Sequence, residues 1–115
     1  LPVPVSGAFH TPYMAPARDR LRKALGTTEI RRPDAPVVAN VDALPHDGAD
    51  EWTGLLAAQL CSPVRWRQSL YRLDQMGVNT YLELGPGNVL SSLTKRTVSG
   101  QPLSIGTPDQ LDKLL

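Results

Sequence analysis

The sequence predicts an α/β fold with parallel strands. Short apolar runs alternate with longer segments whose apolar residues recur every three or four positions, and turn residues separate the two kinds of segment. The expected order is strand, helix, strand, two helices, strand, helix, strand and helix. Such alternation is typical of parallel sheets packed against helices.

The composition is that of an ordinary globular protein. The 115 residues suit one small domain or part of a larger one. The formal net charge of +1 gives no reason to expect a nucleic-acid or anionic-membrane partner, and no apolar run approaches the roughly 20 residues of a membrane span. Residues 1–5 have no basic n-region and no small-residue cleavage site, so we do not expect them to be a secretory signal. Without an initiator Met we expect a fragment or a processed product.

The single cysteine limits both redox and metal chemistry. Cys61 has no partner for an internal disulfide, which fits a reducing cytoplasm. One cysteine and two widely separated histidines give no zinc-type spacing. We therefore expect a structural thiol and no bound metal.

The first two strands and the first helix are bounded by proline and glycine. Residues 1–5 form a short strand that two prolines confine to a sheet edge or a strand end. A helix begins near Met14, and Gly26 stands where a left-handed residue ends a helix. Residues 37–41 are mostly apolar and predict a buried strand.

A loop and a second helix follow. Residues 42–50 read as a loop, and we interpret His46 within it as an exposed histidine. Asp50 is the expected N-cap of a helix whose apolar face also carries the polar Gln59. That amide is either at the edge of the apolar stripe or buried with partners.

The C-terminal half alternates helix and strand. Asn88 is the expected N-cap of a helix that follows the Gly-Pro-Gly turn. A strand, a glycine-rich turn and a helix N-terminus can hold a phosphate, but neither the Rossmann nor the P-loop spacing is present. The remaining expected elements are a helix from Ser62-Pro63 to Gly77, a strand over residues 78–84, a helix to about Thr97, a strand over residues 103–105, and a terminal helix that Thr107 and Gln110 begin as a capping box.

His10 is the first candidate for chemistry. It lies between the expected first strand and the first helix, and strand exits carry the loops that face ligands in α/β enzymes. Imidazole also has the pKa best suited to proton transfer near neutral pH. A lone histidine beside an apolar Phe9 is more often a packed or solvated residue than a catalyst, so the pattern alone does not assign a catalytic role to His10.

Three motifs together resemble a known family. They are G-A-F-H-T-x-x-M-x-P-A (7–17), A-Q-L-C-S-P-V-R-W (58–66), and E-L-G-P-G-N-V-L (83–90) followed by L-T-K-R (93–96). In order and spacing they resemble the C-terminal part of malonyl-CoA:acyl-carrier-protein transacylases and of polyketide synthase acyltransferase domains. The tail lacks the aromatic-rich linker of the synthases, so a free-standing transacylase is the better match.

The resemblance implies a fold and a mechanism. Residues 1–6 would be the last strand of a ferredoxin-like subdomain, and residues 7–115 the C-terminal part of a hydrolase-like core with a parallel sheet. In this family a serine in G-x-S-x-G attacks malonyl-CoA, a histidine takes its proton, and acyl carrier protein then accepts the malonyl group. His10 matches that histidine, and Gln59 matches the residue whose backbone carbonyl orients the ring.

The resemblance also assigns substrate contacts. Phe9 matches a position where phenylalanine accompanies malonyl and serine accompanies methylmalonyl, because a bulky ring fills the space of a 2-methyl group. Phe9 as ordinary core is the alternative. Asn88 and Val89 match a turn near the cleft of relatives. Malonyl-CoA is then the substrate, and no cofactor is implied.

The partners follow from what the chain lacks. None of its serines lies in G-x-S-x-G, so the nucleophile, the oxyanion-hole residues and the carboxylate-binding arginine are expected in an upstream half of the same enzyme. This chain alone would be inactive. An acidic acyl carrier protein would meet basic residues, for which the candidates are Arg65, Arg67, Lys95 and Arg96.

Two rival functions remain. One is a non-catalytic docking or structural fragment, and the other is an acyl hydrolase with the same dyad. The expected location is the cytoplasm, in fatty acid or polyketide synthesis.

Overall fold

The computed structural model describes residues 7–114, which form two compact units. The first unit is Leu1–Ser69 and the second is Leu70–Leu115. The predicted strand at residues 1–5, and the assignment of residues 1–6 to a ferredoxin-like subdomain, lie outside the described residues. No helix of the described part is long and apolar enough to cross a membrane.

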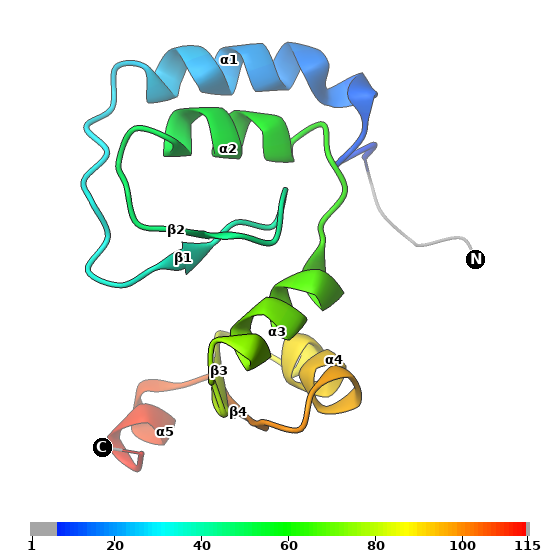
Figure 1. The fold of residues 1–115 in the computed structure, drawn as a ribbon, viewed down its shortest axis with the longest axis vertical. Helices are drawn as coiled ribbons and strands as arrows, with labels where there is room; N and C mark the ends of the chain where they lie inside the picture. The colour runs from blue at the N-terminus through cyan, green and yellow to red at the C-terminus, as the bar shows by residue number, and fades with distance from the viewer. Residues whose placement is uncertain (1–6, 115) are drawn as a thin grey trace. The chain divides into compact units, whose positions relative to one another are not determined.

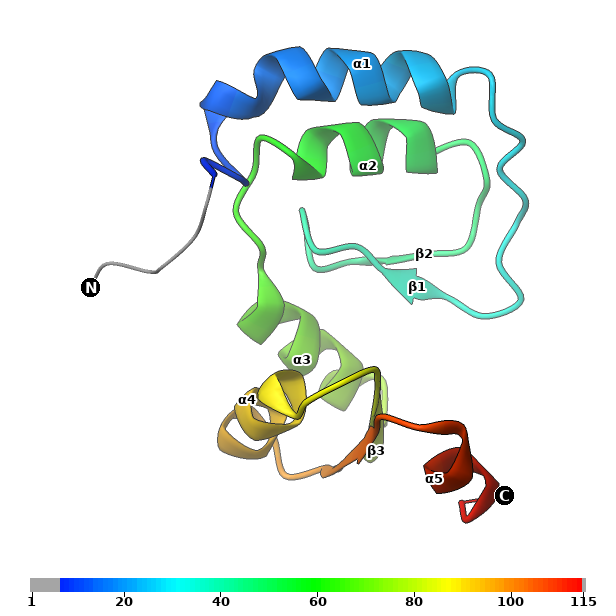
Figure 2. The same ribbon diagram turned by 180° about the vertical axis from the view of Figure 1, so that it is seen from behind.

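The first unit is a pair of helices beside a short hairpin. Both views show α2 between α1 and the β1–β2 pair (Figures 1 and 2). Ala17, Leu21 and Leu25 are half-buried and fall at helical spacing on α1, and α1 contacts α2. The elements are η1 (Pro12–Met14), α1 (Ala15–Leu25), β1 (Val37–Val38), β2 (Pro45–His46) and α2 (Trp52–Gln59).

The hairpin corrects the prediction of one long strand followed by a loop. Val37 pairs with His46 and Val38 with Pro45, and the pairing is antiparallel. The chain reverses because Ala43 has a φ of 62° and the Asp42 carboxylate accepts the Leu44 N–H at 2.9 Å. The predicted strand therefore ends at Val38, and the expectation of parallel strands is wrong for this pair.

The third helix starts later than predicted. The expected start at Ser62-Pro63 is wrong, because α3 spans Trp66–Gln75. The Arg65 N–H donates to the Asn40 carbonyl at 2.9 Å, which holds the preceding residues against the loop of the hairpin. Proline also disfavours a helical conformation at the residue before it.

Two predicted caps differ from the structure. The N-cap of α2 is Glu51, not Asp50, and its side chain makes no capping hydrogen bond to the helix. Gly26 has a φ of −63°, so the first helix ends without a left-handed residue. By contrast, Gly77 has a φ of 85° and ends α3 as predicted.

The second unit contains the succession strand, helix, strand and helix, and its two strands pair in parallel. Strands β3 and β4 pair in parallel from Thr80 with Gln101 to Leu84 with Ile105, and α4 forms the crossover between them (Figure 1). This part of the α/β prediction is confirmed. The elements are β3 (Thr80–Leu84), α4 (Val89–Thr97), β4 (Gln101–Ile105) and α5 (Pro108–Asp112).

The start of α4 is held by a carboxylate from β3. Glu83 accepts the N–H groups of Leu90 at 3.0 Å and Ser91 at 2.7 Å, whereas the predicted N-cap Asn88 makes no side-chain capping bond. The hydrogen bond from the Ser91 N–H is the main cause that lowers the pKa of Glu83. Because a carboxylate already occupies these amides, the structure does not favour a phosphate there.

We expect Glu83→Gln to destabilise the chain near neutral pH, because a neutral amide is a weaker acceptor for the two N–H groups. The folded-state pKa of Glu83 lies below its ordinary value of 4.5, so its contribution is present above that value and is lost as the pH falls through the folded-state pKa. Urea unfolding at about pH 7 and about pH 3 measures this difference.

The matched control is Asp112→Asn, which neutralises an exposed carboxylate on α5. Equal destabilisation by Glu83→Gln at both pH values would contradict the assignment.

Candidate active site

His10 lies in a tight turn between the start of the described chain and η1. The Thr11 hydroxyl donates to the Ala8 carbonyl at 2.6 Å, and the Met14 N–H donates to the Thr11 carbonyl at 3.0 Å. His10 itself has a φ of 63°, a left-handed conformation that costs a non-glycine residue about 1–2 kcal/mol. Such strain persists where neighbouring contacts fix the backbone, and it is common at functional sites.

The ring of His10 contacts the last residue of α2. Nδ1 of His10 lies 2.9 Å from the carbonyl oxygen of Gln59. A carbonyl only accepts, so Nδ1 carries the proton and donates it, and in the neutral ring Nε2 is then the basic nitrogen. The Gln59 carbonyl also accepts the Ser62 N–H at 3.3 Å, and its two lone pairs allow it to accept both donors.

The side chain of Gln59 fixes the chain after α2. Its Nε2 donates to the Ser62 carbonyl at 3.0 Å and lies 3.3 Å from Nδ1 of His10. In this tautomer the Nδ1–H of His10 and the Nε2 amide of Gln59 are both donors, so they do not hydrogen-bond to each other. The hydrogen bond of the ring is therefore the one to the Gln59 carbonyl. The amide on the apolar helix face thus has partners, although its Oε1 is buried with none among the described residues.

The other predicted site residues are all exposed. Phe9 is 56% exposed, which argues against an ordinary core role within this chain, and its ring lies so close to Gly7 that a Cβ there would meet Cε2 at 2.8 Å. Asn88 and Val89 begin α4 in the second unit, and Val89 is 68% exposed. The first unit therefore brings together Phe9, His10 and Gln59.

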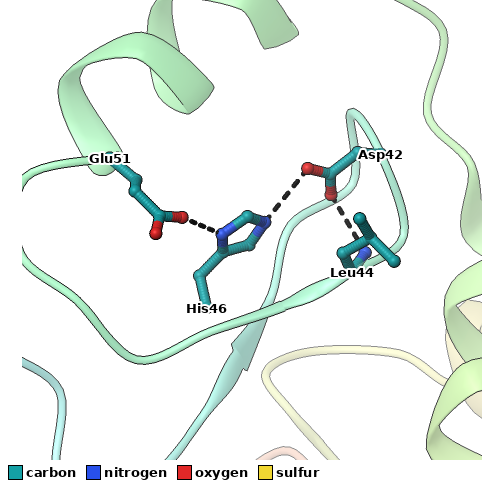
Figure 3. Close-up of polar contacts among 4 residues, drawn as sticks. All are labelled: Asp42, Leu44, His46 and Glu51. Carbon is teal, nitrogen blue, oxygen red and sulfur yellow. Dashed lines mark hydrogen bonds and ion pairs between the residues drawn. The ribbon is translucent and has the colours of Figure 1, made fainter.

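The contacts of the second histidine, His46, were not predicted from the sequence. The prediction of an exposed His46 is wrong, because its side chain is only 13% exposed and contacts two carboxylates, Asp42 and Glu51 (Figure 3). The acidic residues four positions before and five after His46 were the available signal. In the part of the chain that the structure describes, no group of three or more His, Cys, Asp or Glu side chains is arranged to hold a metal.

Comparison with known proteins gives many relatives of one kind. A malonyl CoA-acyl carrier protein transacylase of Bacillus subtilis is 41% identical over 96 residues, which are 84% of this chain and 30% of that protein. One of Synechocystis is 36% identical over 115 residues, 99% of this chain and 39% of that protein. No protein-family profile matches the chain.

Solved structures agree with these relatives. An acyl carrier protein S-malonyltransferase from Vibrio cholerae has a TM-score of 0.92 at 37% identity, covering 100% of this chain and 38% of that one. The chain is homologous to malonyl CoA-acyl carrier protein transacylases. It spans 30–39% of the length of these transacylases, as a C-terminal fragment would.

We expect His10→Asn to leave the stability of the turn that contains His10 nearly unchanged and His10→Val to lower it. Asparagine accepts left-handed backbone and offers a side-chain N–H to the Gln59 carbonyl, whereas a β-branched residue does neither. The expected difference in the free energy of unfolding is about 1–2 kcal/mol. Urea unfolding of the two variants measures it, and equal stability would show that the left-handed conformation imposes no constraint.

Proposed function

We propose that this chain supplies the histidine of a malonyl-CoA:acyl-carrier-protein transacylase. The observation that carries the proposal is the contact between Nδ1 of His10 and the Gln59 carbonyl at 2.9 Å, which leaves Nε2 as a base. Homology to transacylases over most of the chain supports the reaction class. The same likeness supports residues 7–115 as the C-terminal part of a hydrolase-like core.

In this mechanism the nucleophile is a serine outside the chain. Nε2 of His10 takes the proton of the serine hydroxyl as its oxygen attacks the thioester carbonyl of malonyl-CoA. The tetrahedral intermediate collapses, the C–S bond breaks, and CoA leaves as the thiol with the proton from Nε2. The phosphopantetheine thiol of acyl carrier protein then gives its proton to Nε2 as its sulfur attacks the ester carbonyl of malonyl-serine. The C–O bond to serine breaks, and the serine oxygen takes the proton from Nε2.

The Gln59 carbonyl takes the place of a carboxylate in this dyad. It holds the ring orientation through Nδ1–H, and a carbonyl at a helix C-terminus carries partial negative charge that favours the transient imidazolium. His10 without the serine forms no acyl-enzyme, so the chain alone is inactive in this proposal. The upstream half of the same enzyme is the partner that completes the site.

Acyl carrier protein is the proposed acceptor. One structural neighbour with a TM-score of 0.91 and 37% identity is a malonyl-transacylase in complex with a type II polyketide synthase acyl-carrier protein. The four basic candidates, Arg65, Arg67, Lys95 and Arg96, are all exposed, as contact with an acidic partner requires. The proposed location is the cytoplasm, and no cofactor takes part.

We expect His10→Asn to lower malonyl transfer by roughly 10²–10⁴-fold, because the variant keeps the donor to Gln59 and loses the base. The assay joins this chain to the upstream half of a transacylase and follows malonyl-CoA consumption and malonyl-acyl carrier protein by intact mass. Asp34→Asn, at an exposed position between α1 and β1, is the matched control.

The outcomes separate the rival functions. Unchanged transfer in His10→Asn would indicate a non-catalytic docking or structural fragment. Consumption of malonyl-CoA without formation of malonyl-acyl carrier protein would mean that water accepts the malonyl group, and this would indicate an acyl hydrolase. Transfer by this chain without the upstream half would overturn the division of the site between two segments.

We expect Phe9→Ser to raise transfer of methylmalonyl relative to malonyl by ~10-fold, because the smaller side chain frees the space of one methyl group. Phe9→Leu keeps most of the bulk and serves as the matched control. The ratio of kcat/KM values for the two acyl-CoA substrates is the measurement, and an unchanged ratio in Phe9→Ser would remove Phe9 from substrate selection.

A further inference from the structure

His46 lies between two carboxylates from different segments of the first unit. Its Nε2 is 3.0 Å from Oδ2 of Asp42, on the turn of the hairpin, and its Nδ1 contacts the carboxylate of Glu51 at the start of α2 (Figure 3). The His46 side chain is 13% exposed, against 31% for Asp42 and 55% for Glu51. The edge of the ring also meets Trp52, with the centroids 5.8 Å apart.

Both contacts are hydrogen bonds only when the ring is charged. A neutral imidazole has one N–H, and two ionised carboxylates offer only acceptors, so the second N–H requires the imidazolium. The hydrogen bond to Glu51 is the largest cause that raises the pKa of His46, and that to Asp42 adds to it against the opposing effect of burial. Asp42 and Glu51 are the ionisable groups acting on His46 among the described residues.

His46 connects the start of α2, through Glu51, with the turn of the hairpin, through Asp42. Glu51 accepts the N–H groups of Gly54 and Leu55 through its own carbonyl, at 3.1 Å each, so it belongs to the first turn of the helix. Eight residues form α2, and the last of them is Gln59. The loop that carries Asp42 also carries Asn40, whose carbonyl holds the N–H of Arg65 beyond the other end of α2.

We propose that the His46 imidazolium is a positioning residue that ties the first turn of α2 to the hairpin loop and thereby keeps the Gln59 carbonyl in place for His10. The hairpin then contacts Glu51, just before α2, through His46, and it contacts Arg65, beyond the end of α2, through the Asn40 carbonyl. An eight-residue helix fixed on both sides does not slide or rotate relative to the His10 turn. Loss of the His46 proton removes one of its two hydrogen bonds and loosens the first of these supports.

The direction of the pH dependence follows from the raised pKa of His46. Its contribution to stability is fully present below the unfolded-state pKa and is lost as the pH rises through the folded-state pKa. This is opposite to the behaviour expected for Glu83, so the two effects are separable in one pH series of the same chain.

The first test is an NMR titration of the 115-residue chain with labelled histidines. We expect His46 to titrate above the ordinary value of 6.5, and Glu51→Gln to lower its pKa, because the amide keeps an acceptor but removes the charge. Asp42→Asn should act in the same direction while its Oδ1 still accepts the Leu44 N–H. Asp47→Asn is the matched control, since that carboxylate pairs with Arg32 instead.

The second test follows the ring nitrogens of His10 in the same samples. In the neutral His10 ring of the parent chain we expect Nδ1 to show the signal of a protonated nitrogen and Nε2 that of an unprotonated one. Glu51→Gln and His46→Gln should shift both signals toward the average of two tautomers, whereas Asp47→Asn should not. A variant that stays folded with unchanged His10 signals would show that His46 stabilises only its own loop.

These readouts are independent of acyl transfer. The importance of the contact for catalysis rests on the proposed function, but the contact itself is measured in the chain alone. If the joined enzyme transfers no malonyl group and the His10 signals still respond to Glu51→Gln, the proposed function fails and the positioning role stands. A His46 pKa that is ordinary, or insensitive to both carboxylate variants, overturns the positioning role.

Discussion

The hydrogen bond from the His10 ring to the Gln59 carbonyl joins residues 49 positions apart and fixes how the first unit is built. One end requires a left-handed histidine, which the Thr11 and Met14 contacts of the turn enforce. The other end is the Gln59 carbonyl at the end of α2, which accepts the Ser62 N–H at 3.3 Å as well as the N–H of the ring. A carbonyl oxygen has two lone pairs, so the backbone turn after α2 leaves one of them for His10.

Free backbone groups at helix ends are used twice in this chain, with opposite charge. At the end of α2 a carbonyl accepts from an imidazole, and at the start of α4 two N–H groups donate to the Glu83 carboxylate. Both arrangements follow the helix dipole, since the C-terminal end favours positive charge and the N-terminal end negative charge. The two helix ends differ in what they leave free. Glu83 occupies two N–H groups at the start of α4, so these are not available to bind another anion, whereas His10 uses only Nδ1 in its contact with Gln59.

Local patterns predicted the regular elements, and contacts between distant residues decided the rest. The periodicity of α1, the bounds of α4 and the parallel pairing of β3 with β4 follow from spacing and turn residues within each segment. The late start of α3 accompanies the contact of Asn40 with Arg65, which no local pattern contains. Likewise Gln59 stood out as a polar residue on an apolar face, but only the resemblance paired it with His10. The contacts of His46 were missed because its carboxylates lie on the hairpin turn and at the start of α2, and helical spacing rules give no expectation for that arrangement.

The two histidines show how the same ring acquires different chemistry from its neighbours. His10 meets one neutral acceptor, is exposed, and leaves Nε2 without a contact to Gln59, so its ring can take up and release a proton within a reaction. His46 meets two carboxylates and is mostly buried, and its contacts with them raise its pKa. In the proposed mechanism a base must give its proton back at each turnover, which two flanking charges would oppose. The arrangement of partners, more than the residue type, therefore favours His10 over His46 as the proposed base.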